Sequence, residues 1–270
     1  MIRIISILAG AFFAFALLIS LSKGTYSYIT DPPKHSVEHL FHKHPKELAL
    51  ASDGMMGKFD RQQLQRGFQV YTEVCANCHA LKQVSYRDLK DLGYNDAEVK
   101  AIAKKAKVPA YNALTGEVKS MDGKPSDHFP PVVYGGKGTP PDLSLMTKAR
   151  HGGASYVYSL LTGYQAQPAE LIKEFPDAKT PDGLFFNPYF ANLNLSMPPP
   201  LTSEGQVSYA DGTKPTVDQM AKDVSAFLVW TAEPKLEKRH QTGVPVVLFL
   251  LFATVLAYMA YLNVWAGKKH

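Results

Sequence analysis

The sequence predicts a mostly α-helical protein with long loops, followed by one C-terminal transmembrane helix. Two long uncharged apolar runs lie near the two ends of the 270-residue chain. Between them, apolar residues recur at helical spacing behind good N-capping residues, and no sustained alternation of apolar and polar residues indicates a sheet. With 46% hydrophobic and 20% charged residues, the composition is that of a globular protein and excludes a disordered or collagen-like chain.

The first apolar run covers residues 4–21 and is flanked by Arg3 and Lys23. Its 18 residues fall between the apolar core of a cleaved signal peptide, about 7–15 residues, and a spanning helix, about 17–25 residues. No clear cleavage site follows the run. We therefore expect residues 1–24 to be an export signal or an N-terminal anchor, and residues 25–243 to be an exported domain.

Two cysteines close together carry the chemistry of this domain. Residues 75–79 read Cys-Ala-Asn-Cys-His, the C-x-x-C-H signal for attachment of c-type haem. Cys75 and Cys78 would each add to a haem vinyl group, and His79 would present its imidazole to the iron. A thioredoxin-like redox motif explains the pattern less well, because that motif needs no trailing histidine. The sequence therefore predicts a c-type cytochrome haem domain with one covalent haem c.

An amphipathic helix is predicted immediately before this motif. Asp60 is a good N-capping residue, and Gln63 follows three residues later. Apolar residues then recur at helical spacing: Leu64, Phe68, Tyr71 and Val74. We expect one helix to deliver both cysteines to the haem.

Three further helices have capping signals. Asn95 is expected to cap a helix that runs to Lys107, and Asp142 a short helix after it. Thr216 is expected to open a helix that Pro234 ends. The protein thus reads as helices joined by long loops.

The sixth iron ligand decides between electron transfer and catalysis. A methionine thioether raises the reduction potential and blocks other ligands, whereas an open site suits a haem enzyme. Met197 precedes three prolines, which exclude a helix and stiffen the loop, so it is the favoured ligand. Met121 and Met146 are alternatives, and Met220 is expected in the core because it lies on the apolar face of a helix. A haem enzyme with an open sixth site remains the competing function at this point.

The C-terminal apolar run, residues 244–267, is uncharged over 24 residues and long enough to cross a bilayer. Pro245 fits the first turn of such a helix. Aromatic residues typical of a membrane interface lie toward its C-terminal end: Tyr258, Tyr261 and Trp265. The positive-inside rule, with residues 25–243 on the exported side, predicts that residues 268–270 form a cytoplasmic tail.

At this point the chain resembles the cytochrome c1 family, the haem subunit of the bc1 complex (quinol–cytochrome c reductase), in its bacterial form. The resemblance runs from about Gln65 to the C-terminus. It is carried by an ordered set of motifs: RGFQVYTEVCANCHAL, VSYRDL, GKPSDHFP, PPDLSLMTKARHGG, YVYSLLTGY, GLFFNPYF, SMPPPL, DGT and MAKDVSAFLVWTAEP. It implies His79 and Met197 as iron ligands, and Arg150 as the partner of a haem propionate. Relatives usually carry an Asn-containing stretch where this chain has residues 132–139, so the resemblance assigns no propionate contact to that loop.

The resemblance also implies a function. The chain would be a non-catalytic electron-transfer subunit that accepts electrons from the Rieske iron–sulfur subunit and passes them to a cytochrome c, with quinol oxidation in cytochrome b. It would belong to a dimeric complex in the bacterial inner membrane, with the haem domain in the periplasm. The alternative is an anchored c-type cytochrome that serves another dehydrogenase or an oxidase.

Charge bears on the partners. The formal net charge of +5 and the pI of about 9.0 would by themselves suggest nucleic acid or an anionic membrane. Four of the bases flank the apolar runs, and without them 25 bases face 24 acids, so we expect no nucleic-acid partner. Residues 82–150 hold 12 bases and 8 acids, whereas residues 170–237 hold 10 acids and 5 bases. The acidic part is either an ordinary solvated surface or a docking face for a basic cytochrome c.

The segment with His35, His39, His42 and His44 is expected to be solvated rather than to bind metal, because Lys, Glu and Pro residues are interspersed with the histidines.

Overall fold

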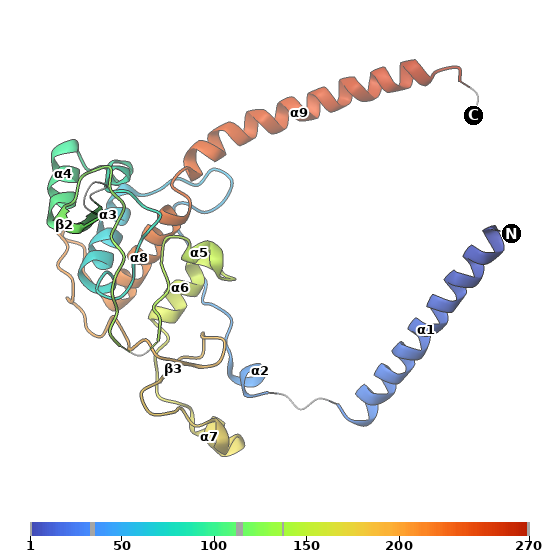
Figure 1. The fold of residues 1–270 in the computed structure, drawn as a ribbon, viewed down its shortest axis with the longest axis horizontal. Helices are drawn as coiled ribbons and strands as arrows, with labels where there is room; N and C mark the ends of the chain where they lie inside the picture. The colour runs from blue at the N-terminus through green and yellow to red at the C-terminus, as the bar shows by residue number, and fades with distance from the viewer. Residues whose placement is uncertain (1, 33–35, 112–115, 137, 269–270) are drawn as a thin grey trace. The chain divides into compact units, whose positions relative to one another are not determined.

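The computed structural model describes residues 2–32, 36–111, 116–136 and 138–268 (Figure 1). His35 and the last two residues of the tail expected at 268–270 lie outside this part of the chain. The chain divides into two compact units, with the boundary after Phe41.

The first unit consists of helix α1 (Ile2–Thr30) and the short helix α2 (Val37–Phe41). None of the residues of α1 is buried. The helix continues nine residues beyond the apolar run at 4–21, so the expected domain boundary at residues 24–25 falls inside it.

The second unit holds the remaining elements. Its helices and helical turns are α3 (Arg61–Val70), η1 (Tyr71–Cys75), η2 (Tyr86–Leu92), α4 (Asp96–Lys105), α5 (Met146–Ala149), α6 (Gly153–Leu161), α7 (Ala169–Glu174), η3 (Pro176–Ala178), α8 (Val217–Ala232) and α9 (Leu236–Trp265). Two small antiparallel hairpins join β1 (Lys107–Tyr111) to β2 (Val118–Asp122), and β3 (Phe185–Phe186) to β4 (Asn194–Leu195). The expectation of a mostly α-helical fold with long loops is confirmed.

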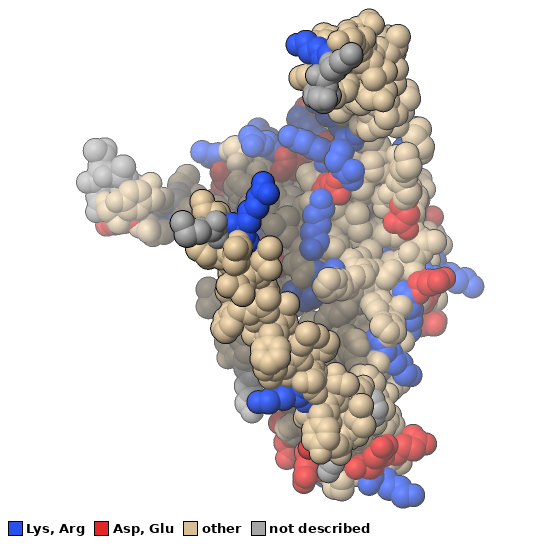
Figure 2. Space-filling model, turned by 90° about the vertical axis from the view of Figure 1, so that its right-hand side faces the viewer, with Lys and Arg blue, Asp and Glu red and all other residues tan. Residues whose placement is uncertain are grey.

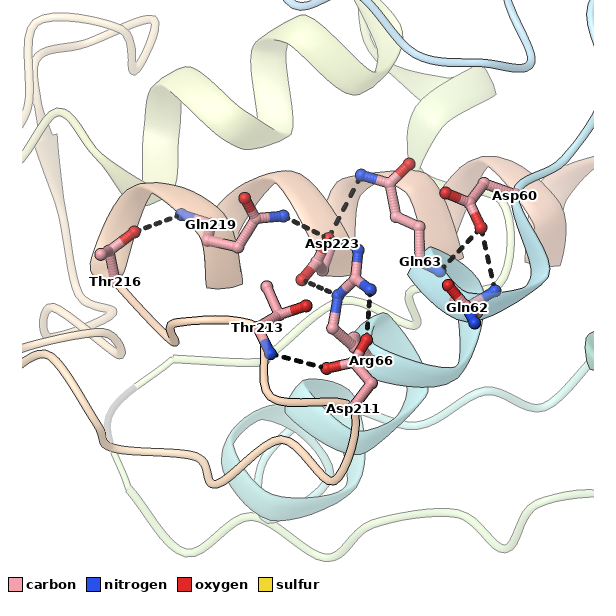
Figure 3. A network of polar contacts seen from close by, with 9 residues as sticks. All are labelled: Asp60, Gln62, Gln63, Arg66, Asp211, Thr213, Thr216, Gln219 and Asp223. Carbon is pink, nitrogen blue, oxygen red and sulfur yellow. Dashed lines mark hydrogen bonds and ion pairs between the residues drawn. The ribbon is translucent and has the colours of Figure 1, made fainter.

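Three of the four predicted N-caps are confirmed. The Asp60 side chain accepts hydrogen bonds from the backbone N–H groups of Gln62 and Gln63 (Figure 3). Asn95 forms a complete capping box at the start of α4, and the Thr216 hydroxyl accepts from Gln219 at the start of α8. Each cap satisfies N–H groups that have no partner within the helix.

The fourth cap prediction is wrong. Asp142 does not cap α5, which begins after Leu145 without a side-chain cap. One oxygen of Asp142 accepts from the N–H of Ser144 at 2.9 Å, and the other accepts from the N–H of Lys82 at 2.8 Å. The carboxylate therefore connects the loop at residues 141–144 to the segment that follows the C-x-x-C-H motif.

The hairpins were not predicted. The helix after Asn95 ends at Lys105, and Lys107 begins strand β1, which pairs with β2 in the register Lys107–Asp122. All five residues of β2 are exposed. A strand without a buried face has no reason to alternate apolar and polar residues, which is why the pattern gave no signal.

Helix α3 packs closely against α8, and this contact organises the core (Figure 1). A Cβ atom on Gly67 of α3 would lie 2.1 Å from the backbone oxygen of Asp223 in α8, so only glycine allows this approach. An aromatic cluster continues the contact, with ring centroids 5.6 Å apart for Phe68 and Phe227 and for Phe227 and Trp230. Helix α3, which leads to the C-x-x-C-H motif, is therefore fixed in place by packing its buried face against α8.

Two helices of the described chain, α1 and α9, are long and apolar enough to cross a membrane. Figure 2 shows Lys, Arg, Asp and Glu side chains scattered over the drawn face, with uncharged surface between them. Helix α9 begins eight residues before the run at 244–267, so Pro245 lies inside the helix and not in its first turn, contrary to the expectation. The extra turns belong to the soluble part: Leu236 is buried, and Glu237 accepts from the Phe59 N–H at 2.8 Å.

Candidate functional site

The C-x-x-C-H motif lies where α3 changes its geometry. After Val70 the helix widens into the π-helical turn η1, in which the Ala76 N–H bonds the carbonyl of Tyr71 at 2.8 Å. Cys75 ends this turn, and Cys78 follows in a turn. The prediction of one regular helix carrying both cysteines is therefore only partly right. π-helical turns inside helices are rare and occur often at functional sites.

The two thiols are half-buried and form no disulfide. Burial, with a contribution from the neighbouring Cys78 thiol, raises the pKa of Cys75 to about 12. A redox-active cysteine needs the opposite, a lowered pKa and a thiolate. The surroundings of Cys75 therefore do not favour the thiolate that a thioredoxin-like motif needs.

The orientation of His79 is set by a backbone carbonyl. Its Nδ1 atom lies 2.7 Å from the carbonyl oxygen of Pro141. A carbonyl only accepts hydrogen bonds, so Nδ1 carries the proton and Nε2 has its lone pair free for a metal. The Tyr71 hydroxyl donates to the carbonyl of His79 at 3.0 Å, and the Leu143 N–H donates to the carbonyl of Ala80 at 2.9 Å. This is the arrangement that orients a metal-binding imidazole, and it fits an iron porphyrin bound at Cys75 and Cys78.

Described residues of the stretch 132–139 form one wall of a cavity beside Cys78. Val132, Tyr134 and Gly138 line this cavity together with Cys78. The resemblance assigned no contact to this loop, so its position next to the motif is a finding of the structure.

The segment of Met197 also reaches this loop. Met197 is half-buried in the irregular stretch after β4. A Cβ atom on Gly138 would lie 3.8 Å from the side chain of Ser196, the residue before Met197. The hydroxyl of Tyr164 donates to the carbonyl of Met197 at 3.0 Å. The structure thus brings the Met197 loop and the Cys78 cavity to the same loop.

The other candidate methionines lie elsewhere. Met146 packs in the hydrophobic core at the start of α5, and Met121 is 48% exposed on strand β2. Met220 is fully buried, as predicted from its position on the apolar face of α8.

Arg150 does not line the cavity beside Cys78. It follows α5, is exposed, and donates from one guanidinium nitrogen to the carbonyl of Ala149 at 3.0 Å. It also interacts with Tyr156, whose pKa is raised by burial. Its contact with a propionate therefore stays a prediction.

Three residues of the site were missed by the sequence reasoning: Tyr71, Pro141 and Tyr164. Pro141 acts through its backbone carbonyl, which leaves no side-chain signature in a sequence. Tyr71 was noted only as part of the apolar face of its helix. The sole pointer to Tyr164 and Pro141 was their place inside the motifs YVYSLLTGY and PPDLSLMTKARHGG.

Comparison with known proteins gives a consistent result. The model of the Cytochrome C1 family matches residues 50–268. The chain is 41% identical over 239 residues to cytochrome c1 of Rhodospirillum rubrum, covering 80% of this chain and 86% of that protein. It is 38% identical over 264 residues to cytochrome c1 of Cereibacter sphaeroides, covering 84% and 88%. It is also 38% identical over 253 residues to "Cytochrome c1 1, heme protein, mitochondrial" of Arabidopsis thaliana, covering 90% and 79%. The chain belongs to the cytochrome c1 family.

Proposed function

We propose that this chain is the membrane-anchored electron-transfer subunit of a bc1 complex, which takes single electrons from the Rieske iron–sulfur protein and passes them to a cytochrome c. The cofactor is one covalent haem c. The observation that carries the proposal is the Nδ1–H bond from His79 to Pro141, which leaves Nε2 free beside two unpaired cysteines. The family and its relatives support the same function.

Each site residue has a proposed role. Cys75 and Cys78 would hold the haem by thioethers, His79 and Met197 would bind the iron, and Arg150 would pair with a propionate. Bound haem supplies a one-electron iron couple. The Pro141 carbonyl keeps the His79 ring in one tautomer, and the Met197 thioether raises the reduction potential and excludes outside ligands. No residue of this chain is assigned a catalytic role.

We also propose the topology. Helix α9 crosses the inner membrane of a bacterium, with the haem domain (residues 25–243) in the periplasm and residues 268–270 in the cytoplasm. The segment at 1–24 is an export signal or a second anchor. The apolar length of both helices supports their assignment as spans. Basic residues flank the apolar run of α9 on both sides, so the orientation rests on the proposed export of residues 25–243.

The partners follow from the same proposal. Cytochrome b and the Rieske protein are the complex partners, in a dimeric assembly, and a basic cytochrome c docks on the acidic part of the chain at residues 170–237. Docking between opposite charges weakens as salt screens them. Electron transfer to a basic cytochrome c should therefore slow as ionic strength rises. A rate that does not fall would rule out the acidic docking face.

The Met197 ligand is tested by Met197→Leu in the full-length holoprotein. Leucine has no ligand atom, so the reduction potential should fall and the reduced haem should bind carbon monoxide. Met146→Leu is the matched control, because Met146 lies in the core, and it should leave both properties unchanged. An unchanged potential in Met197→Leu, or a fall in Met146→Leu alone, would refute the assignment.

The complex is tested by affinity purification of the full chain from its native membrane. Cytochrome b and a Rieske protein should co-purify. Recovery of another dehydrogenase or of an oxidase in their place would favour the alternative of an anchored cytochrome serving a different enzyme.

A further inference from the structure

The backbone of the loop that carries Met197 is restricted on both sides of this residue. Leu193, four residues before Met197, has φ +65°, the left-handed region that non-glycine residues rarely adopt. Leu193 is nevertheless buried, and its carbonyl accepts from the Asn187 N–H at 2.8 Å. Such conformations persist where the surroundings over-determine them, and they gather at functional sites. After Met197, three prolines restrict the backbone on the other side.

This loop is anchored to the end of helix α6. Asn187, which is fully buried, donates from its side-chain amide to the carbonyl of Leu160 at 2.8 Å. Gly163 lies directly against the ring of Tyr189, since a Cβ atom there would approach the ring to 2.4 Å. The next residue, Tyr164, donates its hydroxyl to the carbonyl of Met197 itself. Residues at and just after the end of α6 therefore contact the loop at two places. One is the segment with Asn187 and Tyr189, and the other is the proposed ligand Met197.

We infer that Tyr164 is a positioning residue for the sixth iron ligand, holding the Met197 backbone so that its thioether stays on the iron in both oxidation states. The inference rests on the proposed ligand role of Met197 and adds the residue that sustains it. The hydroxyl bonds the backbone carbonyl, so it acts on the position of the loop and leaves the sulfur free. Met197 is half-buried in an irregular segment, where its carbonyl takes part in no helix or strand ladder and accepts from the Tyr164 hydroxyl.

The test is Tyr164→Phe in the full-length holoprotein, which removes one oxygen atom and keeps the ring. Phenylalanine cannot donate to the Met197 carbonyl, so the loop loses one of its restraints. The fraction of haem with a detached Met197 should rise about tenfold, which corresponds to about 1.4 kcal/mol. We expect faster carbon monoxide binding by the reduced haem, a lower reduction potential and a weaker ferric charge-transfer band of the thioether-ligated iron.

Tyr158→Phe is the matched control. Tyr158 lies on α6, and its hydroxyl donates to Asp218 and not to the Met197 loop. Tyr158→Phe should lose stability without opening the haem. If Tyr164→Phe binds carbon monoxide no faster than Tyr158→Phe, the inference is overturned.

The outcome for the proposed ligand is separate. Met197→Leu tests ligation itself, and an unchanged potential there would remove the proposed function of Met197. If Met197→Leu opens the haem and Tyr164→Phe does not, the ligand stands and the positioning role fails. In the double variant, Tyr164→Phe should add nothing to the opening caused by Met197→Leu.

A measurement on the unaltered protein covers the case in which Tyr164→Phe binds no haem. Met197 is the single methionine of this sequence that is followed by proline, so ¹³C-carbonyl methionine combined with ¹⁵N-proline singles out the Met197 carbonyl in NMR spectra. Its carbonyl resonance should shift when the solvent is changed from H₂O to D₂O, since the hydrogen on the Tyr164 hydroxyl exchanges. A resonance that does not shift would overturn the inference.

Discussion

Replacing Arg66 by methionine should destabilise the haem domain strongly. Its guanidinium donates from Nε to one oxygen of Asp223 at 2.9 Å and from a terminal nitrogen to the other at 3.3 Å (Figure 3). The Asp223 side chain is fully buried between α3 and α8. Arg66→Met would leave this carboxylate without a cation, and breaking a buried ion pair from one side costs about 3–5 kcal/mol.

The structure predicts an asymmetry between the two partners. Arg66 is also paired with Asp211 at 2.6 Å, and 14% of its side chain is exposed. In Asp223→Asn the guanidinium therefore keeps a counter-charge, and the loss should be smaller, about 1–3 kcal/mol. Arg61→Met is the matched control on the same helix, because the Arg61 side chain is 43% exposed and its pair with Glu237 should contribute about 1 kcal/mol or less.

The double variant Arg66→Met/Asp223→Leu separates charge burial from packing. With both charges gone, most of the loss in Arg66→Met should be recovered. A remainder of about 1–3 kcal/mol is expected, because the side-chain amides of Gln63 and Gln219 lose their acceptor (Figure 3). The assay is urea unfolding of the full-length holoprotein in detergent, followed by circular dichroism and haem absorbance. If Arg66→Met lowers the free energy of unfolding no more than Arg61→Met does, the Arg66–Asp223 pair is not a desolvated ion pair.

Three further predictions concern stability, measured in the same way. Glu237→Ala should cost about 1–2 kcal/mol because the Phe59 N–H loses its acceptor, whereas Glu237→Gln keeps an acceptor oxygen and should cost less; equal losses would contradict this. Gly67→Ala should lower the free energy of unfolding by about 1–3 kcal/mol or more, since the new Cβ forces α3 and α8 apart. An unchanged stability would show that the two helices can separate without cost. A hydrogen bond from Lys222 lowers the pKa of Asp218 below 3.8, so its contribution to stability is present above that pH and is lost as the pH falls through the folded-state value. Asp218→Asn should therefore lose less stability at acid pH than the unaltered chain, and superimposable pH profiles would refute the linkage.

The elements that sequence predicted well are those whose causes are local. Asp60, Asn95 and Thr216 cap their helices through N–H groups two or three residues away. Such contacts are visible in a short window of sequence. The apolar faces of α3 and α8 and the two long uncharged runs are equally local signals.

What sequence reasoning missed depends on partners far away in the chain. Asp142 looked like a helix cap, but its carboxylate bonds the N–H of Lys82, sixty residues earlier. The Tyr164 hydroxyl and the Met197 carbonyl are 33 residues apart, and the acceptor is a backbone atom that any residue would carry. The hairpin β1–β2 was missed because none of the five residues of β2 is buried. The candidate ligands were found from their chemistry, whereas the groups that orient them needed the fold.

Helix α3 contacts both α8 and α9, the candidate membrane span, and it leads to the C-x-x-C-H motif. At its first turn, Arg61 pairs with Glu237 of α9 at 3.0 Å. In its middle, Arg66 bonds Asp223 of α8, and beyond its end the ring of His79 bonds the Pro141 carbonyl. The Arg61–Glu237 pair therefore joins the first turn of α9 to α3, the helix that leads to the haem motif. The exposed pair at Glu237 is weak alone, but the buried pair behind it resists separation of α3 from α8. Loss of Arg66 should therefore loosen the contacts of α3 more than loss of Arg61 does, in the same order as the two losses affect stability.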